Sequence, residues 1–222
     1  MAKRAPGAQR REDSLSRERI IEASIELLDA SGEEGLTFRA LSERLASGPG
    51  AIYWHIANKS DLLSAACDAV VARTINKTVV TTPKATIRAV GLAVFDLIDE
   101  HPWVGSVLTS AEGLSPIVRI LERIGQQIRV LGVPKRKQWA AVGALVAYIL
   151  GVSKQNAANG QLARTRGLDR ADFLEAMSTA WSQLDANEYP FSRSVAGQIK
   201  THDDRVDFLA GIDLILKGIV SA

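Results

Sequence analysis

The sequence has very little cysteine and almost no excess of charge of either sign. Cys67 stands alone among 222 residues, so no internal disulfide can form, and a reducing compartment such as the cytoplasm is expected. The 27 lysines and arginines nearly balance the 25 aspartates and glutamates, and the formal net charge of +2 does not by itself favour nucleic acid as a partner. A nucleic-acid partner must therefore be recognised from motifs and from the local placement of residues.

Long apolar runs and catalytic motifs are absent as well. The longest uncharged apolar run, residues 138–153, is shorter than the roughly 20 residues of a membrane span, and the basic N-terminus lacks the apolar segment of a signal peptide. No Gly-x-Ser-x-Gly, P-loop or His-Glu-x-x-His motif occurs, and Tyr53 stands where a Gly48-x-Gly50 dinucleotide motif needs its third glycine. One cysteine and three scattered histidines offer no metal cluster. We expect neither an enzyme, nor a metal or cofactor, nor contact with a membrane.

Apolar residues recur at helical spacing along most of the chain, and no segment shows the alternation of a β-strand. The pattern predicts an all-α protein. The expected helices cover about 16–31, 37–45, a short stretch after 48, 60–78, 83–100, a segment to about 110, 117–131, 135–159, 169–184 and 203–220. Loops are expected at 112–116 and 160–169, and irregular structure at 186–202.

The first three helices predict a small helix-turn-helix domain. Thr37 is a capping residue type at the start of the second helix, and Ser47-Gly48-Pro49-Gly50 forms a turn before the short third helix. Ile52 and Ile56 are four residues apart and share the face that anchors this third helix, so the aromatic run 53–55 points elsewhere. Because the second helix of a helix-turn-helix enters the major groove, this run indicates a surface that contacts DNA.

The chain divides into three segments by this pattern. Residues 1–15 are polar and basic and predict a flexible arm, residues 16–60 form the helix-turn-helix domain, and residues 61–222 form a larger helical bundle. The arm is either a tail without a role or a basic extension whose Arg10 and Arg11 reach phosphates or a minor groove.

Two helices of the larger bundle are apolar on more sides than the other helices of a single chain are expected to cover. The helix at about 135–159 is apolar on almost every side between Trp139 and Val152, and the last helix, at 203–221, is apolar on more than one face. Either both helices lie at the centre of one bundle, or a second copy covers them in a two-fold dimer through a four-helix bundle. We expect the homodimer.

Three segments between Arg17 and Leu63 carry a specific signature. They are Ile20-Ile-Glu-Ala-Ser-Ile-Glu-Leu-Leu28, Gly35-Leu-Thr-Phe-Arg-Ala-Leu41 and Ile52-Tyr-Trp-His-Ile-Ala-Asn-Lys59. These segments resemble the tetracycline-repressor-like (TetR) family of one-component bacterial transcriptional regulators. The C-terminal half is similar to the tetracycline-repressor subclass through Tyr148-Ile-Leu-Gly151 and Phe208-Leu-Ala-Gly-Ile-Asp-Leu-Ile-Leu-Lys-Gly-Ile219.

The resemblance implies an α-helical homodimer that presents one helix-turn-helix to each half of a palindromic double-stranded DNA operator. Members of this family most often repress transcription. A small-molecule inducer, here of unknown identity, would tilt the helix that starts near Ser60 and move the two recognition helices out of register with the operator.

The resemblance also implies roles for individual residues. Lys59, Tyr53 and Thr37 match positions that hold phosphate, and such contacts position the protein without reading sequence. Arg39 matches a position that reads a base, while residues 54–55 match positions that meet base edges or the sugar-phosphate wall. The expected DNA-binding residues are Thr37, Arg39, Pro49, Gly50, Ala51, Tyr53, Trp54, His55 and Lys59.

The turn departs from the family pattern. Ala46-Ser47 stands where the family usually has glycine and then valine, and Pro49, Gly50 and Ala51 occupy the front of the recognition helix, where many relatives carry polar readers. These three residues offer only backbone groups or an apolar contact with a thymine methyl. A second hypothesis therefore stays open, namely a ligand-binding or protein-interaction module with a non-functional helix-turn-helix.

The resemblance places a ligand pocket in the larger bundle. Tetracycline-responsive members use a histidine for the magnesium-bound drug in the region that reads Trp103-Val-Gly-Ser-Val-Leu-Thr109 here, so a tetracycline–metal inducer is not expected. Aromatic and amide side chains on the enclosing helices are candidate ligand contacts, although each also suits an ordinary core. They are His101, Trp103, Trp139, Tyr148, Gln155, Asn156 and Trp181. His202 lies in a polar stretch and is expected to be solvated.

Overall fold

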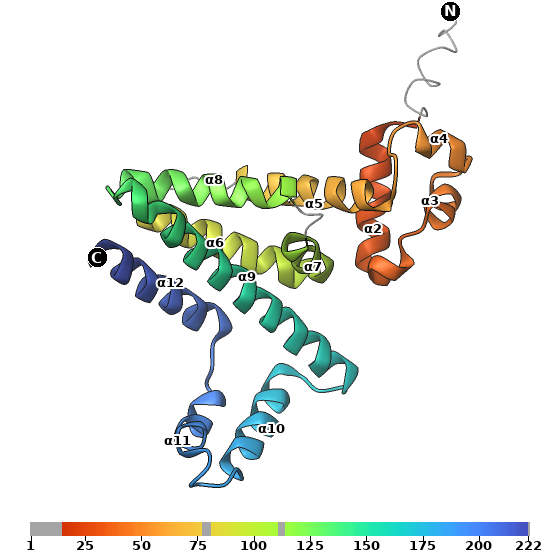
Figure 1. Cartoon of the computed structure of the whole chain (residues 1–222). Helices are drawn as coiled ribbons and strands as arrows, with labels where there is room; N and C mark the ends of the chain where they lie inside the picture. Colours follow the sequence, from red (N-terminus) through yellow and green to blue (C-terminus); the bar gives the residue numbers. More distant parts are fainter. Residues whose placement is uncertain (1–14, 77–80, 111–113, 222) are drawn as a thin grey trace, which may run out of the picture. The chain divides into compact units, whose positions relative to one another are not determined.

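The computed structural model describes residues 15–76, 81–110 and 114–221 (Figure 1). Within these ranges the chain forms eleven helices and no strand, which confirms the all-α prediction. Two compact units are present: unit 1 comprises the described residues up to Arg73 with Trp103–Arg119, and unit 2 those of Thr74–Pro102 and Ile120–Ala222. No described helix combines the length and apolarity that crossing a membrane requires. The N-terminal arm with Arg10 and Arg11 lies outside the described residues.

Unit 1 contains the three helices expected of a helix-turn-helix. They are α2 (Arg17–Gly35), α3 (Phe38–Leu45) and α4 (Pro49–Tyr53). Side-chain oxygens cap the first two, because the Arg19 N–H donates to Ser16 at 3.2 Å and the Ala40 N–H donates to Thr37 at 3.1 Å. Gly32 has φ 64° and breaks the helical geometry inside α2, at the point where the sequence predicted the helix to end.

The turn between α3 and α4 contains an alanine in a left-handed conformation. Ala46 has φ 49° and ψ 41°, which costs a residue with a Cβ atom roughly 1–2 kcal/mol. Its N–H donates to the carbonyl of Glu43 at 3.3 Å, and the Ser47 N–H donates to the carbonyl of Ser42 at 3.0 Å. Glycine at this position would avoid the penalty, because it has no Cβ atom.

Unit 1 contains three further helical segments. They are α5 (Lys59–Asn76), α7 (Pro102–Thr109) and the first part of α8 (Leu114–Val130). The side-chain oxygen of Asn58 accepts the Asp61 N–H at 2.8 Å, so Asn58 caps α5. The buried Trp103 of α7 donates its indole N–H to Asp29 of α2 at 2.8 Å.

Unit 2 is built on three helices that lie side by side (Figure 1). They are α6 (Pro83–Glu100), α9 (Lys135–Thr165) and α12 (Asp204–Ser221). The sides that face one another are apolar, and Ile149 of α9 and Ile212 of α12 have no exposed surface. Arg88 of α6 forms an ion pair with Asp213 of α12 at the edge of this packing.

Three expectations about helix boundaries were wrong. α8 starts at Leu114 rather than at 117, so part of the expected loop 112–116 is helical. α9 continues to Thr165 through a segment expected to be a loop, and Gly167 with φ 66° follows its end. α11 (Pro190–Ile199) lies in a stretch expected to be irregular, and it packs against α10 (Arg170–Ser182) (Figure 1).

Candidate nucleic-acid interface and ligand groove

The short helix α4 and the turn after it combine a buried anchor with an exposed aromatic run. The sequence placed residues 53–55 together on one short helix, but α4 ends at Tyr53, and residues 54–55 lie in the turn that follows. Ile52 and Ile56 are 0% and 4% exposed, whereas Tyr53 and Trp54 are 53% and 90% exposed. His55 is exposed as well. The division into an apolar anchor and an outward aromatic run is therefore present as the spacing of the two isoleucines predicts, although only Ile52 and Tyr53 of these residues belong to α4.

A stacked aromatic pair, which the sequence did not reveal, orients Tyr53. Its ring centroid lies 4.3 Å from that of Phe38, and the ring planes are 9° apart. Phe38 is the first residue of α3 and Tyr53 is the last residue of α4, so the pair joins the two helices across the turn. Such pairs contribute about 0.5–1.5 kcal/mol beyond the area that they bury. The stacking holds Tyr53 in one place on an otherwise exposed surface.

The charged residues of the expected interface have weak partners in unit 1. Arg39 Nε lies 3.0 Å from Glu43 Oε1, one helical turn away, and both side chains are exposed. The Lys59 ammonium donates to the backbone carbonyl of Glu33. Exposed contacts of this kind are worth up to about 1 kcal/mol, so both cations can exchange them for phosphate or base atoms at little cost. The Thr37 hydroxyl oxygen accepts as a helix cap and keeps its own hydrogen for donation.

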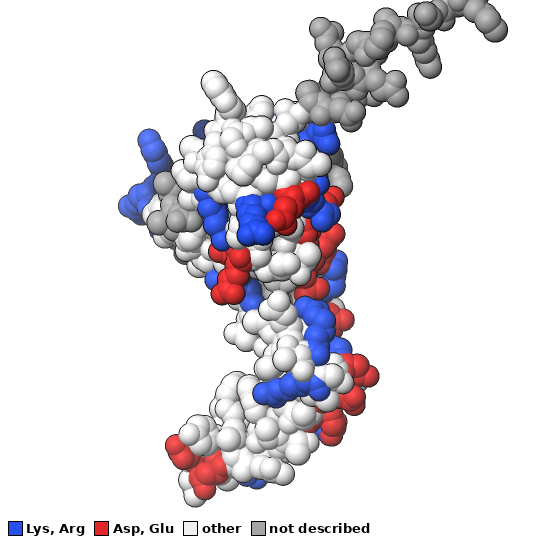
Figure 2. Space-filling model, turned by 90° about the vertical axis from the view of Figure 1, so that its right-hand side faces the viewer, with Lys and Arg blue, Asp and Glu red and all other residues white. Residues whose placement is uncertain are grey.

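The front of α4 carries no charged side chain. Gly48, Pro49, Gly50 and Ala51 are all exposed. A Cβ atom placed on Gly48 or Gly50 would meet no heavy atom within 4 Å, so the backbone here is open to a close approach. Figure 2, which views the side of α3 and α4, shows an uncharged upper surface, below which basic and acidic side chains lie next to one another.

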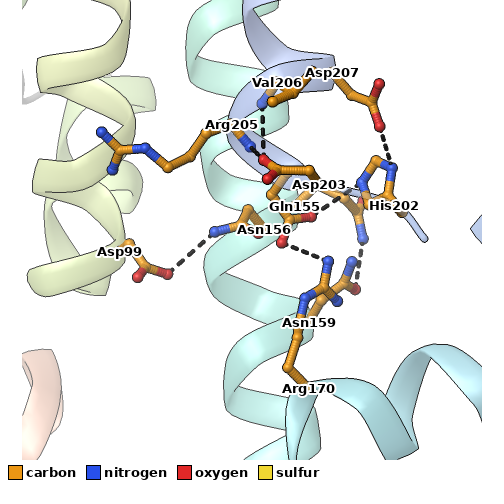
Figure 3. A network of polar contacts seen from close by, with 11 residues as sticks. Asp99, Gln155, Asn156, Asn159, Arg170, His202, Asp203, Arg205, Val206 and Asp207 are labelled. Atoms are coloured by element: carbon orange, nitrogen blue, oxygen red, sulfur yellow. Dashed lines mark hydrogen bonds and ion pairs between the residues drawn. The ribbon is translucent and has the colours of Figure 1, made fainter. Parts of the chain in front are cut away.

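A groove of about 230 Å³ lies in unit 2 between α6, α9 and the start of α12. Three of the predicted ligand residues, Tyr148, Gln155 and Asn156, line it. The other lining residues are Phe95, Val152, Asn159, His202, Asp204, Asp207 and Phe208, which the sequence did not indicate. Figure 3 shows how polar side chains from α6, α9, α10 and the start of α12 converge here.

The other four predicted ligand residues do not line this groove. Trp103 belongs to unit 1, where its indole is hydrogen-bonded to Asp29. His101 follows the end of α6 and its side chain is 16% exposed. Trp139 and Trp181 are 76% and 37% exposed. Their roles as ligand contacts stay predictions.

Hydrogen bonds fix the groove-lining side chains of α9. The Tyr148 hydroxyl donates to the Phe208 carbonyl at 3.1 Å, and Asn156 donates to Asp99 of α6 at 3.2 Å. Burial and the nearby Asp207 carboxylate raise the pKa of Tyr148 above its ordinary value, so the phenol keeps its proton at neutral pH.

His202 is exposed, as expected, but it lies between two carboxylates of α12. Its Nε2 is 3.1 Å from Asp204 Oδ1, and its Nδ1 is 2.5 Å from Asp207 Oδ2 (Figure 3). The three aspartates at positions 203, 204 and 207, shortly after the histidine, were the available signal in the sequence. Within the described residues, no three histidine, cysteine or acidic side chains are grouped so that they could hold a metal ion.

Comparisons with known proteins agree with this architecture. Residues 20–66 match the family described as bacterial regulatory proteins, tetR family. The structure of the transcriptional regulator SCO7222, a TetR from Streptomyces coelicolor, is 48% identical with a TM-score of 0.84, and the match covers 94% of this chain and 99% of that one. The HTH-type transcriptional repressor DrrR1 of Streptomyces coeruleorubidus is 26% identical over 93% of this chain and 77% of its own. The structure of BioQ with its double-stranded DNA operator is 27% identical with a TM-score of 0.59, over 69% of this chain and 92% of that one.

The chain belongs to the TetR family of helix-turn-helix transcriptional regulators. This family consists of transcriptional regulators rather than enzymes.

Proposed function

We propose that this regulator binds a palindromic double-stranded DNA operator as a homodimer and represses transcription in the cytoplasm until a small-molecule inducer releases it. The observation that carries the proposal is the exposed run 53–55 at the end of α4 and in the turn after it, a segment that Ile52 and Ile56 anchor. A relative, BioQ, has been solved with its operator, which supports DNA as the partner.

The proposed DNA contacts divide into positioning and reading. Lys59, Tyr53 and Thr37 hold phosphates, and the stacking on Phe38 fixes Tyr53 for this task. Arg39 leaves Glu43 and reads a guanine in the major groove. Trp54 and His55 meet base edges or the sugar-phosphate wall, while Pro49, Gly50 and Ala51 allow a close apolar approach to the DNA.

The homodimer is supported by two exposed stripes on α9 and α12. The stripe on α9 consists of Ala140, Ala144, Ala147, Gly151 and Ala158, and that on α12 consists of Val206, Ala210, Leu214 and Gly218. The alanines and glycines of these stripes let helices of two subunits approach closely. Leu214 and Val206 are 69% and 61% exposed, so a second copy of the chain would also bury large apolar groups. A two-fold four-helix bundle covers both stripes at once.

The inducer is proposed to act through α5, which follows the recognition helix α4 after the short connection 54–58. Asn58 caps this helix and Lys59 is its first residue, so a tilt of α5 moves a phosphate contact directly. Half-sites recur about every 34–36 Å along B-DNA, and a change of a few ångströms in the separation of the recognition helices therefore weakens operator binding.

Footprinting on the DNA that flanks the protein's own gene tests this function. We expect two protected half-sites related by a two-fold axis. Arg39→Ala should relax the preference at one base pair in each half-site, whereas Arg129→Ala, a matched change on α8, should leave the footprint and its preference unchanged. Absence of protection on any of this DNA at low salt would refute the proposal.

A further inference from the structure

The groove between α6, α9 and α12 has an aromatic wall and an acidic rim. The ring centroids of Phe95 and Phe208 are 4.8 Å apart, and those of Tyr148 and Phe208 are 5.8 Å apart. Asp204 and Asp207, at the start of α12, line the same groove. The faces of aromatic rings and the carboxylates both present negative potential, so both attract a positively charged group.

Of the two aspartates that line the groove, one is paired with an arginine and the other, among the described residues, with a histidine. None of the lining residues is a lysine or an arginine. Asp204 is paired with Arg170 of α10. Asp207 is paired with His202, whose imidazole is charged only when it carries its second proton. A ligand cation can therefore neutralise Asp207 in place of the imidazolium.

The size of the groove restricts what it can hold. Its volume of about 230 Å³ is below the roughly 300–1,000 Å³ of sites that enclose drug-sized ligands. A single ring with a short charged arm is of a suitable scale. Gln155 and Asn156 of α9 supply amide groups to the groove, where a ligand's remaining polar atoms can bind.

We propose that this groove binds a small organic cation, an ammonium or guanidinium group on an aromatic or apolar body. The charged group lies against Asp207, and the body packs on Phe95, Tyr148 and Phe208. An anion of the same shape would face two carboxylates and is excluded. The role of this cation as the inducer rests on the proposed function. Binding of the cation to the groove does not require DNA and can be measured separately.

Three probes that share one ring test the proposal on the full-length protein without DNA. Benzylammonium is the cation, benzyl alcohol its neutral counterpart and benzoate an anion. In ligand titrations followed by protein NMR, benzylammonium should bind at least tenfold more tightly than benzyl alcohol, and benzoate should not shift the groove resonances. Equal affinities for the three probes, or no binding of benzylammonium, would overturn the proposal.

Two variants locate the binding and control for charge. Asp207→Asn should weaken benzylammonium at least tenfold and leave benzyl alcohol unchanged, whereas Glu175→Gln removes the same charge outside the groove and should have no effect. Val152→Phe fills the groove and should abolish binding of both. If benzylammonium binds Asp207→Asn as it binds the original protein, the assignment is wrong. If benzylammonium binds as expected but no operator footprint is found, the DNA function alone is refuted. If the footprint is found but benzylammonium does not bind, the cation site alone is refuted.

Discussion

The side chain of Tyr148 lies directly against Gly211, so that a Cβ atom on residue 211 would come within 1.9 Å of the tyrosine oxygen. The glycine is what lets the phenol of α9 cross to α12, where it donates to the Phe208 carbonyl. The same ring forms part of the aromatic wall of the groove. The shape of the groove therefore depends on this one close approach.

Gly211→Ala should displace Tyr148 and reshape the groove. Overpacking of this kind costs about 1–3 kcal/mol, of which the better helix propensity of alanine recovers up to about 1 kcal/mol. We expect a lower free energy of unfolding in urea and at least tenfold weaker binding of benzylammonium. Gly197→Ala on α11, where an added Cβ meets open space, is the matched control and should stabilise the protein slightly. Unchanged stability and binding in Gly211→Ala would show that Tyr148 moves freely.

Ala46→Gly should stabilise the helix-turn-helix. Glycine removes the cost of roughly 1–2 kcal/mol that an alanine has in the left-handed conformation. It also raises the conformational entropy of the unfolded chain, which destabilises the fold by about 0.4–1 kcal/mol. The expected net gain in the free energy of unfolding is about 0.5–1 kcal/mol. Urea unfolding measures it. Ala40→Gly inside α3 is the control and should lose about 1 kcal/mol, because residue 40 has ordinary helical geometry. A loss of stability in both variants would contradict the left-handed conformation of Ala46.

The ion pair of Glu22 with Arg73 should make a small, pH-dependent contribution to stability. The hydrogen bond from Arg73 lowers the pKa of Glu22 below its ordinary 4.5 in the folded protein. Because the pKa of Glu22 is lower in the folded than in the unfolded protein, the ion pair stabilises the fold at pH values above the unfolded-state pKa. This stabilisation is lost as the pH falls through the folded-state pKa. Both side chains are about half exposed, so it stays within about 1 kcal/mol.

Urea unfolding of Glu22→Gln tests this contribution. The variant should be less stable than the original protein at pH 7, and the difference should shrink as the pH drops below about 4.5. Glu34→Gln is exposed and serves as the control that should show no such trend. A difference that grows on acidification would have the wrong sign.

A charge placed in the stripe of small residues on α9 should prevent dimer formation. Ala147→Glu would place an unpaired carboxylate between closely packed helices. Sedimentation velocity should find a monomer, and operator affinity should fall at least tenfold. Val118→Glu, on an exposed apolar position of α8 outside both stripes, should remain a dimer. A dimeric Ala147→Glu would place the subunit contact elsewhere.

Local signals in the sequence predicted most of the helices correctly. Ser16, Thr37 and Asp169 cap helices as their residue types indicate, and the sequence His101-Pro102 ends α6 where expected. α11 lies in a stretch expected to be irregular, although Pro190 at its start is of a type favoured in a first helical turn. Ala196 is the one buried residue of α11, so this helix has almost no apolar periodicity to detect.

The sites depend on contacts that spacing alone does not encode. The anchor of the recognition helix was predictable, because Ile52 and Ile56 are one helical turn apart. The stacking of Phe38 on Tyr53 joins residues of two helices across a turn, and no local pattern marks it. The groove joins Phe95 of α6 to Asp207 of α12, more than one hundred positions later. Such long-range juxtapositions become visible only once the helices are packed.

The most direct test of the account is the salt dependence of binding to the DNA that flanks the gene, measured by fluorescence anisotropy for the original protein and for Lys59→Ala. Lys200→Ala, which breaks an exposed ion pair with Glu175 on the α10–α11 hairpin, is the control. Lys59→Ala should weaken binding similarly on all sequences and flatten the slope of log K against log salt by about one unit per subunit, while Lys200→Ala should leave it unchanged. An unchanged slope and affinity in Lys59→Ala would contradict DNA binding through this helix-turn-helix.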